Sequence, residues 1–399
     1  MKRSFLFSDR VLIGSGLGLI AATYGLVRLA YGLFLPDVQR DLGFGADVAG
    51  AVSAGGSVLY CVGAVAGSVL AGRAARALAA VAALIAGVGA LVMAASTSTL
   101  VFGTAAVVAS AGAGIASPAL VRLVGDRVEH AALPRAQAMV NSGTGPGLVA
   151  AGFLALVLLP DWRTAWTTAG IVTLVVGGVL VTAAGSARDT AGRGRPPAGP
   201  AGPDRRWLVA HALPMAVALA FGAGSAVVWT YGRTALVEAG VGSALSVGAW
   251  VALGAGGALV AVTSRWTSAL SARRQWALTA AVAGAAVLVL GVAPAVVPVS
   301  LAACTVFGWG YTAATGGLIA WTTEVDRTRA PVGTSALFVL LVAGQALGAA
   351  VAGTVLGLLG TAATFVVAAA VVLAAALVPV VAARTALRRP VATRGHEAR

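Results

Sequence analysis

Arg28 is the residue best placed to do chemistry, because it lies inside the first long apolar stretch of the chain. It precedes Leu35 by seven residues, which is roughly 10 Å along a helix. A charge at that depth of a membrane costs about 2.5 kcal/mol or more, so such residues usually face a cavity or pair with another group. Tyr24 and Tyr31 share its helix face. These residues predict a cationic, aromatic-walled site for an anionic or polar substrate.

Arg28 also has a purely structural interpretation. Its side chain could extend to the membrane surface, or pair with a carboxylate such as Asp37 or Glu238 and hold helices together. Asn141 and Gln345 lie within later apolar stretches. Each could hydrogen-bond a substrate, although polar contacts that serve only helix packing are common.

The sequence lacks the residue motifs that several classes of enzyme and pump require. The only lysine is Lys2, so no Gly-Lys-Ser/Thr phosphate loop exists and the chain alone cannot be an ATP-driven pump. There is no Gly-x-Ser-x-Gly or His-Glu-x-x-His motif, and Cys61, Cys304 and the three histidines are scattered. All 13 acidic residues lie at or beyond the ends of the apolar stretches. We therefore expect no catalytic residues, no metal site and no cofactor.

The composition indicates a protein that lies in a membrane. Of the 399 residues 59% are hydrophobic and only 10% are charged, whereas an ordinary soluble domain has about 25% charged residues. The net charge of +14 does not indicate a nucleic-acid partner, because the basic residues lie in short clusters between apolar runs, as in cytoplasmic loops. Met-Lys-Arg at the start imitates a signal peptide, but no cleavage site follows, so we expect a retained first helix.

The apolar stretches predict an all-α integral membrane fold. At about 20 apolar residues per crossing, the sequence divides into twelve transmembrane helices, with the weakest break near Gly360. The expected spans are 11–35, 48–71, 77–96, 100–122, 136–159, 164–185, 207–231, 244–265, 275–293, 297–322, 332–358 and 361–383.

The distribution of basic residues predicts the orientation of these spans. If both termini are cytoplasmic, 23 of the 27 basic residues lie on the inner side, as the positive-inside rule requires. Only Arg40, Arg163 and Arg233 then fall outside, and Arg28 lies within the first span. We expect a multi-pass protein of a bacterial cytoplasmic membrane.

The sequence also predicts two similar halves. Tyr31-Gly32 recurs as Tyr231-Gly232, and Ala54-Gly55-Gly56 as Ala255-Gly256-Gly257. Asp126-Arg127 recurs as Asp326-Arg327, at the same offset of about 200 residues. We expect an N-terminal six-helix bundle over 1–185, a cytoplasmic linker over 186–206 that is rich in Pro, Gly and Arg, a second bundle over 207–384 and a tail over 385–399.

Two six-helix repeats joined by a cytoplasmic linker resemble the major facilitator superfamily. Residues 70–76 (Leu-Ala-Gly-Arg-Ala-Ala-Arg) are similar to that family's Leu-Ala-Asp-Arg-x-Gly-Arg signature, with Gly72 in place of the aspartate and Ala75 in place of the glycine. Gly145-Pro146 in span five is similar to a motif of exporter members. Residues 24–36, 141–145 and 161–163 resemble a poorly characterised bacterial subgroup of the superfamily.

This resemblance implies a substrate cavity built largely from the first, fourth, seventh and tenth helices. Trp229, Tyr231, Trp309 and Tyr311 are then candidates for its wall; the alternative for Trp229 and Tyr231 is the aromatic belt at the membrane surface. Inner-face charges would form contacts in the outward-facing state and break them in the inward-facing one. The gating candidates are Arg73, Arg76, Asp126, Arg127, Gly145, Pro146, Asp326 and Arg327.

The expected function is a secondary active transporter that moves a small solute by alternating access, with export favoured over import because of Gly145-Pro146. The substrate is expected to be a small molecule, anionic if Arg28 contacts it, and the protein to be monomeric. Coupling to protons stays open beside a uniporter and coupling through the substrate's own charge. The rival from another class is a membrane sensor or scaffold that binds a ligand without moving it.

Overall fold

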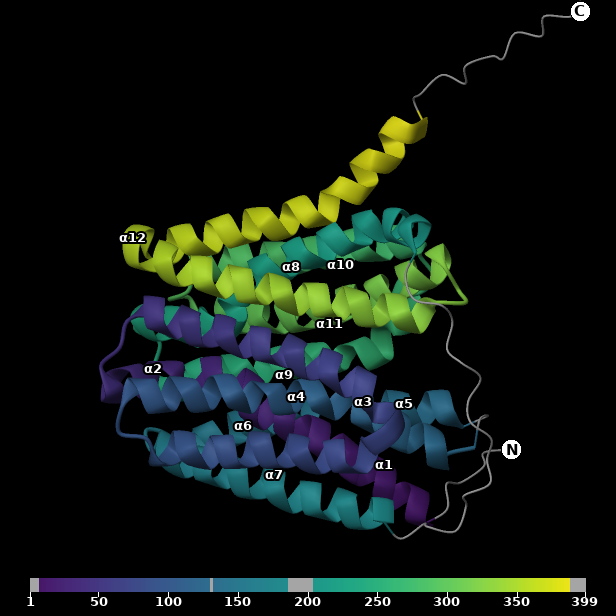
Figure 1. Ribbon diagram of the computed structural model, residues 1–399. Coiled ribbons are helices and arrows are strands. Elements are labelled where there is room, and N and C mark those ends of the chain that lie inside the picture. The colour runs from purple at the N-terminus through teal and green to yellow at the C-terminus, as the bar shows by residue number, and fades with distance from the viewer. Residues whose placement is uncertain (1–6, 130–131, 186–203, 388–399) are drawn as a thin grey trace, which may run out of the picture.

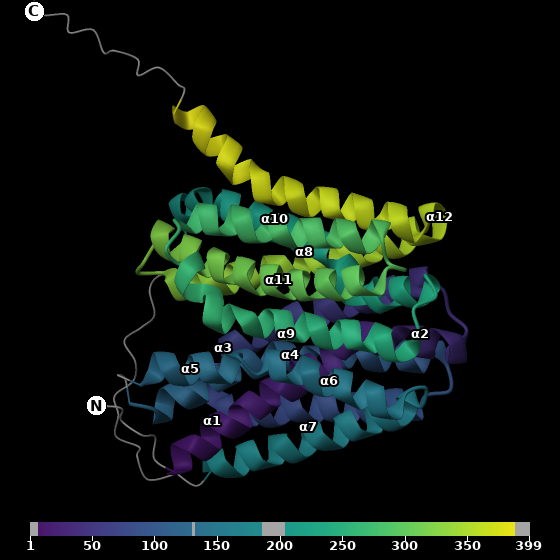
Figure 2. The same ribbon diagram turned by 180° about the vertical axis from the view of Figure 1, so that it is seen from behind.

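The computed structural model describes residues 7–129, 132–185 and 204–387, and in these ranges every regular element is a helix. The helices lie side by side along one direction (Figures 1 and 2). They are α1 (Phe7–Ile20), the π-helix η1 (Ala21–Leu29), α2 (Ala30–Leu42), α3 (Ala46–Ala95), α4 (Thr99–Arg127), α5 (Leu133–Asn141), α6 (Thr144–Leu158), α7 (Trp162–Gly185), α8 (Arg205–Glu238), α9 (Ser243–Thr267), α10 (Ala272–Val292), α11 (Val297–Val325) and α12 (Ala330–Leu387).

Within the described residues, ten helical stretches are long and apolar enough to cross a membrane, rather than the twelve separate spans expected. The difference arises because α3 and α12 run to 50 and 58 residues, each with one non-helical residue inside. These residues are Ala74 (φ −144°, ψ 35°) and Gly360 (φ 79°, ψ 175°). Figure 1 shows both helices folding back on themselves. The sharp bends lie where the sequence predicts breaks between spans.

Two expected spans have irregular backbones. The first runs continuously from α1 through the π-helix η1 into α2, so it extends beyond the predicted 11–35. The fifth is interrupted at Ser142 and Gly143, between α5 and α6. Pro146 explains the interruption, because it lacks the N–H that would bond the carbonyl of Ser142.

The predicted linker and tail fall mostly outside the described residues. At the end of the linker, Arg205 and Arg206 belong to α8, and Asp204 caps that helix by accepting a hydrogen bond from the Trp207 backbone N–H at 2.8 Å. At the other end of the chain, α12 continues to Leu387, past the predicted end of the second bundle.

Helices α1 to α7 occupy one side of the molecule and α8 to α12 the other (Figures 1 and 2). The two groups meet where α2 packs on α8, α3 on α12, and α6 on α9. We call the end of the bundle at which α2 ends and α3 begins the predicted outer end. The end with the bend at Ala74 is the predicted inner end.

Candidate functional site

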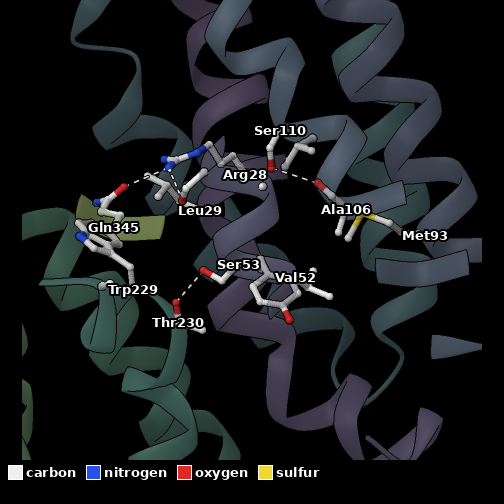
Figure 3. Close-up of a pocket in the computed structure, with 15 residues that line it drawn as sticks. Arg28, Leu29, Val52, Ser53, Met93, Ala106, Ser110, Trp229, Thr230 and Gln345 are labelled. Carbon is white, nitrogen blue, oxygen red and sulfur yellow. Dashed lines mark hydrogen bonds between the residues drawn. The ribbon is translucent and has the colours of Figure 1, made fainter. Parts of the chain in front are cut away.

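A small central cavity of about 40 Å³ lies between the two groups of helices, and Arg28 is part of its wall. The lining comes from both groups (Figure 3). Its polar members are Arg28, Ser53, Ser57, Ser110, Thr230 and Gln345, and its larger apolar and aromatic members are Val27, Leu29, Val52, Tyr31, Met93 and Trp229.

Arg28 reaches across this cavity to the second half of the chain. Its Nη2 donates to Gln345 Oε1 at 3.0 Å and to Ser57 Oγ at 3.4 Å, and Figure 3 shows the bond to Gln345 spanning from η1 to α12. Its guanidinium carbon lies 4.7 Å from the centre of the Tyr60 ring, a cation–π contact. Among the described residues, no carboxylate lies within 4.0 Å of its nitrogen atoms.

The carboxylates proposed as partners for Arg28 are engaged elsewhere. Asp37 pairs with Arg233 and Arg40. Glu238 accepts a hydrogen bond from Thr361 Oγ1 at 2.7 Å. In this structure Arg28 is therefore a half-buried cation held by neutral groups.

Gln345 joins Arg28 to an aromatic cluster. Its Nε2 donates to the Tyr311 hydroxyl at 3.0 Å. The Tyr311 ring stacks on Phe221 at 5.5 Å and meets Trp229 edge-on at 5.1 Å. The indole Nε1 of Trp229 is buried and donates to no group in the described part of the chain. The structure thus brings together Arg28, Trp229, Tyr311 and Gln345 from four helices that are distant in sequence.

The tyrosines predicted beside Arg28 have different roles. The Tyr24 hydroxyl lies 2.5 Å from the Tyr60 hydroxyl, below the ring that Arg28 covers. Tyr31 lines the cavity, and its hydroxyl donates to the Ala49 carbonyl at 3.0 Å. Sequence reasoning missed Tyr60 and Ser57, which are spaced three residues apart on α3, because a lone hydroxyl in an apolar span carries no distinctive pattern.

The backbone around Arg28 is positioned by close helix contact. A Cβ on Gly25 would lie 2.3 Å from the backbone of Gly147, so η1 packs backbone to backbone against α6. A π-helix is wider than an α-helix, and such segments frequently occur at functional sites. The irregular stretches of the first and fifth spans therefore lie against each other beside the cavity.

Five sequence candidates are not part of the cavity wall. Two of them, Tyr24 and Tyr311, adjoin it through Tyr60 and Gln345, and the other three lie farther away. Asn141 is exposed. Trp309 donates to Thr263 Oγ1 at 2.8 Å, between α11 and α9. Tyr231 is fully buried, and its hydroxyl donates to the Ala46 carbonyl at 2.7 Å, which corrects the interpretation of this tyrosine as part of an exposed aromatic belt. Its bond connects the two halves at the predicted outer end.

A buried ion pair also connects the halves at this end. Arg233 is 2% exposed and pairs with Asp37, which is 6% exposed. The same Nη1 donates to the Leu33 carbonyl at 2.7 Å, and Nε donates to Ser246 Oγ at 3.2 Å. The distribution of basic residues predicts Arg233 on the outer side. In the structure its side chain turns inward, to a carboxylate of the other half.

The backbones of the two halves also lie in close contact at the predicted outer end. A Cβ on Gly32 would lie 2.0 Å from the Trp229 carbonyl oxygen, and one on Gly50 would lie 2.4 Å from that of Ala349. At the cavity wall itself, Ser53 Oγ and Thr230 Oγ1 are 2.8 Å apart (Figure 3). The halves are therefore in direct contact between the cavity and the predicted outer end.

Within the described residues, the gating candidates at the predicted inner end form hydrogen bonds and ion pairs only with their own half. Arg76 and Arg127 donate to backbone carbonyls of α7, and Asp126 pairs with Arg122. The hydroxyl of Thr328, followed by the backbone and guanidinium of Arg329, lowers the pKa of Asp326 to about 2. Among the described residues, Arg73 and Arg327 are exposed and have no partner.

Solved transporter structures share this fold at low sequence identity. One is a nucleoside transporter, NupG, with a TM-score of 0.72 at 14% identity, covering 94% of this chain and 99% of the other. Another is a peptide transporter, POT, with a TM-score of 0.78 at 14% identity, covering 96% of each chain. A third is a bacterial homolog of the human lysosomal transporter Spinster, described as inward-facing and occupied, with a TM-score of 0.70 at 14% identity, covering 96% of this chain and 98% of the other.

No curated protein matches this sequence. The family model of the Major Facilitator Superfamily matches residues 17–339, which is most of the chain. With its many membrane-spanning helices, this multi-pass membrane protein belongs to the Major Facilitator Superfamily and is a transporter of small molecules.

Proposed function

We propose that the chain is a secondary active transporter that carries a small polar or anionic solute across a bacterial cytoplasmic membrane by alternating access. The observation that carries this proposal is the bond from Arg28 of one half to Gln345 of the other, at a central cavity. A cation in the membrane interior normally faces a cavity or a counter-charge, and no described carboxylate pairs with this one. The substrate would supply the missing contact.

We also propose twelve crossings, with residues 1–185 and 207–384 as two six-helix bundles. Thr99 Oγ1 donates to the Leu42 carbonyl at 3.2 Å, so the two ends of α3 lie at the same end of the molecule. The bond from Thr361 to Glu238 likewise places the bend of α12 beside the end of α8. If α3 and α12 each cross the membrane twice, the ten helical stretches make twelve crossings. An even number of crossings puts both termini on the same side, and the distribution of basic residues favours the cytoplasmic side.

The contacts between the halves support an assignment of this conformation to the state that is closed to the outside. Tyr231, Arg233 and the glycine contacts connect the halves at the predicted outer end. In the part of the chain that the structure describes, the inner-face gating candidates make no hydrogen bond or ion pair across the halves. In the opposite state the outer contacts would break, and the charges at Arg73, Asp126 and Asp326 would meet partners across the inner face.

We propose export as the direction of transport. The support is the similarity of Gly145-Pro146 to an exporter motif, together with its place beside the break in the fifth span. A helix that is already interrupted at Ser142 and Gly143 can change its bend without breaking a regular ladder of hydrogen bonds.

The test is a measurement of two conformations. Leu100 and Val292 are exposed, one in each half, at the predicted outer end. Fluorophores on Leu100→Cys and Val292→Cys, in a Cys61→Ala/Cys304→Ala background in lipid nanodiscs, report the separation of the halves in single molecules. We expect a short and a longer separation that interconvert. A single separation under every ligand of a screen of small anions, sugars and cationic drugs would reject alternating access.

A further inference from the structure

The charges that lie between the two halves do not balance. Asp37 and Arg233 compensate each other, and Arg40, 65% exposed, approaches Asp37 only from the rim. Arg28 is then left with a whole positive charge, surrounded by Gln345, Ser57 and Tyr60, which are all neutral. Within the described helices, the interface between the halves thus lacks one negative charge.

The donors around the cavity suit a carboxylate. Arg28 has five N–H groups, and only those on Nη2 have partners among the described residues. The planar guanidinium can give two parallel hydrogen bonds to the two oxygens of one carboxylate. The indole N–H of Trp229 is a further buried donor that has no partner among the described residues, and an unsatisfied buried donor is destabilising until a ligand or a rearrangement satisfies it.

The dimensions and walls of the cavity limit the rest of the ligand. A volume of about 40 Å³ has room for about three water molecules in this conformation. Val27, Val52 and Met93 provide apolar contacts opposite the polar side chains. The cavity therefore fits a carboxylate with a short apolar body, and a second negative charge would find no buried cation to pair with.

We propose that the cavity binds a short-chain monocarboxylate through Arg28, and that the transporter changes between its two conformations efficiently only with this anion bound, so that it exchanges monoanions. This inference rests on the proposed function, since it needs two conformations. While the site is open, water solvates the Arg28 charge. During the transition the site is closed on both sides, and the charge must then be carried without bulk water. A bound monoanion neutralises it, whereas an empty site leaves it uncompensated.

Transport by this cycle is an exchange of one monoanion for another across the membrane. After one anion has left, the empty transporter returns slowly, and a second anion on the other side restores a fast return. No proton is needed in this cycle, because the charge of the substrate itself balances that of Arg28.

The experiment uses the labelled Leu100→Cys/Val292→Cys protein and measures the rate of interconversion in sulfate buffer at pH 7.4. The probes are propionate, its neutral isostere propionamide, and the dianion malonate. We expect propionate to raise the rate by roughly tenfold or more, and propionamide and malonate to have little effect. The Arg28→Gln variant should interconvert rapidly without anion and ignore propionate. Arg28→Lys should keep the anion dependence at higher propionate concentration.

The control variant is Arg265→Gln. Arg265 also covers an aromatic ring, that of Trp266 at 4.1 Å, but lies outside the cavity, so its loss should leave the propionate effect unchanged. Equal rates with and without propionate in the protein with Arg28 intact would overturn the proposal, and so would an effect of propionamide equal to that of propionate. In either case, two interconverting separations would still support the proposed transporter. A larger effect of malonate would overturn the assignment to a monoanion. A single separation under all conditions would instead reject the proposed function itself.

Discussion

At the scale of single residues, the buried pair of Arg233 and Asp37 is the most vulnerable contact between the halves. Removing one partner of a buried ion pair leaves a charge without compensation, which typically costs about 3–5 kcal/mol. The pair joins α8 to α2, and the proposed opening of the outer end would separate these helices, so Arg233→Ala should penalise the closed conformation more than the open one. We expect the single-molecule measurement to shift towards the longer separation.

The control for this prediction removes both charges together. Arg233→Leu combined with Asp37→Leu leaves no uncompensated ion, and similar replacements of buried pairs are often neutral. The double variant should therefore return towards the short separation. If Arg233→Ala alone leaves the distribution unchanged, the pair does not hold the outer end closed.

The residues of the candidate site show how far a sequence can predict chemistry. Arg28 and Gln345 stand out, because a charge or an amide inside an apolar span is rare and expensive. That Gln345 bonds to Arg28 does not follow from the sequence, since their separation along the chain exceeds 300 residues. Arg233 shows what a sequence leaves out: its place just beyond a predicted span indicates only the outer side. Its inward contacts with Asp37 and Leu33 depend on the packing of α8 on α2.

At the scale of helices, regular spans could be predicted and their irregularities only in part. Pro146 and Gly360 indicate an interruption and a bend through their own backbone chemistry, and the structure has one at each place. The π-helix η1 has no such residue signal. It lies where Gly25 contacts Gly147 of another span, and sequence periodicity alone does not reveal such a contact.

The bend of α12 yields a prediction at this scale. Gly360 has φ 79° and ψ 175°, a conformation that only glycine adopts easily and that costs other residues about 1–3 kcal/mol. Gly360→Ala should therefore destabilise the protein by about that amount, seen as a lower thermal unfolding midpoint in detergent. The matched control is Gly357→Ala, three residues earlier on the same helix with open space at its Cβ position, which should be neutral or slightly stabilising. Equal midpoints for the two variants would contradict a strained bend.

For the whole molecule, composition and charge were sufficient to predict an all-helical membrane protein. The low content of charged residues indicates a lipid environment, the distribution of arginines predicts the orientation of the spans, and the offset of about 200 residues predicts two similar halves. The conformation that the halves adopt is a different matter. It depends on contacts such as Gly32 with Trp229 and Gly50 with Ala349. In the sequence, these glycines cannot be told apart from the many other small residues of the spans.

The crossing of the membrane by both arms of α3 is open to a direct test in intact cells. The bond between Thr99 and Leu42 places the loop around Thr97 on the same side as Arg40, and the bend next to Arg73 on the other. In the background without native cysteines, a maleimide that cannot cross membranes should label Arg40→Cys and Thr97→Cys from outside. It should label Arg73→Cys only after the cells are permeabilised. Because one crossing by α3 would put Arg40 and Thr97 on opposite sides, protection of Thr97→Cys in intact cells together with labelling of Arg40→Cys would rule out the folded-back arrangement.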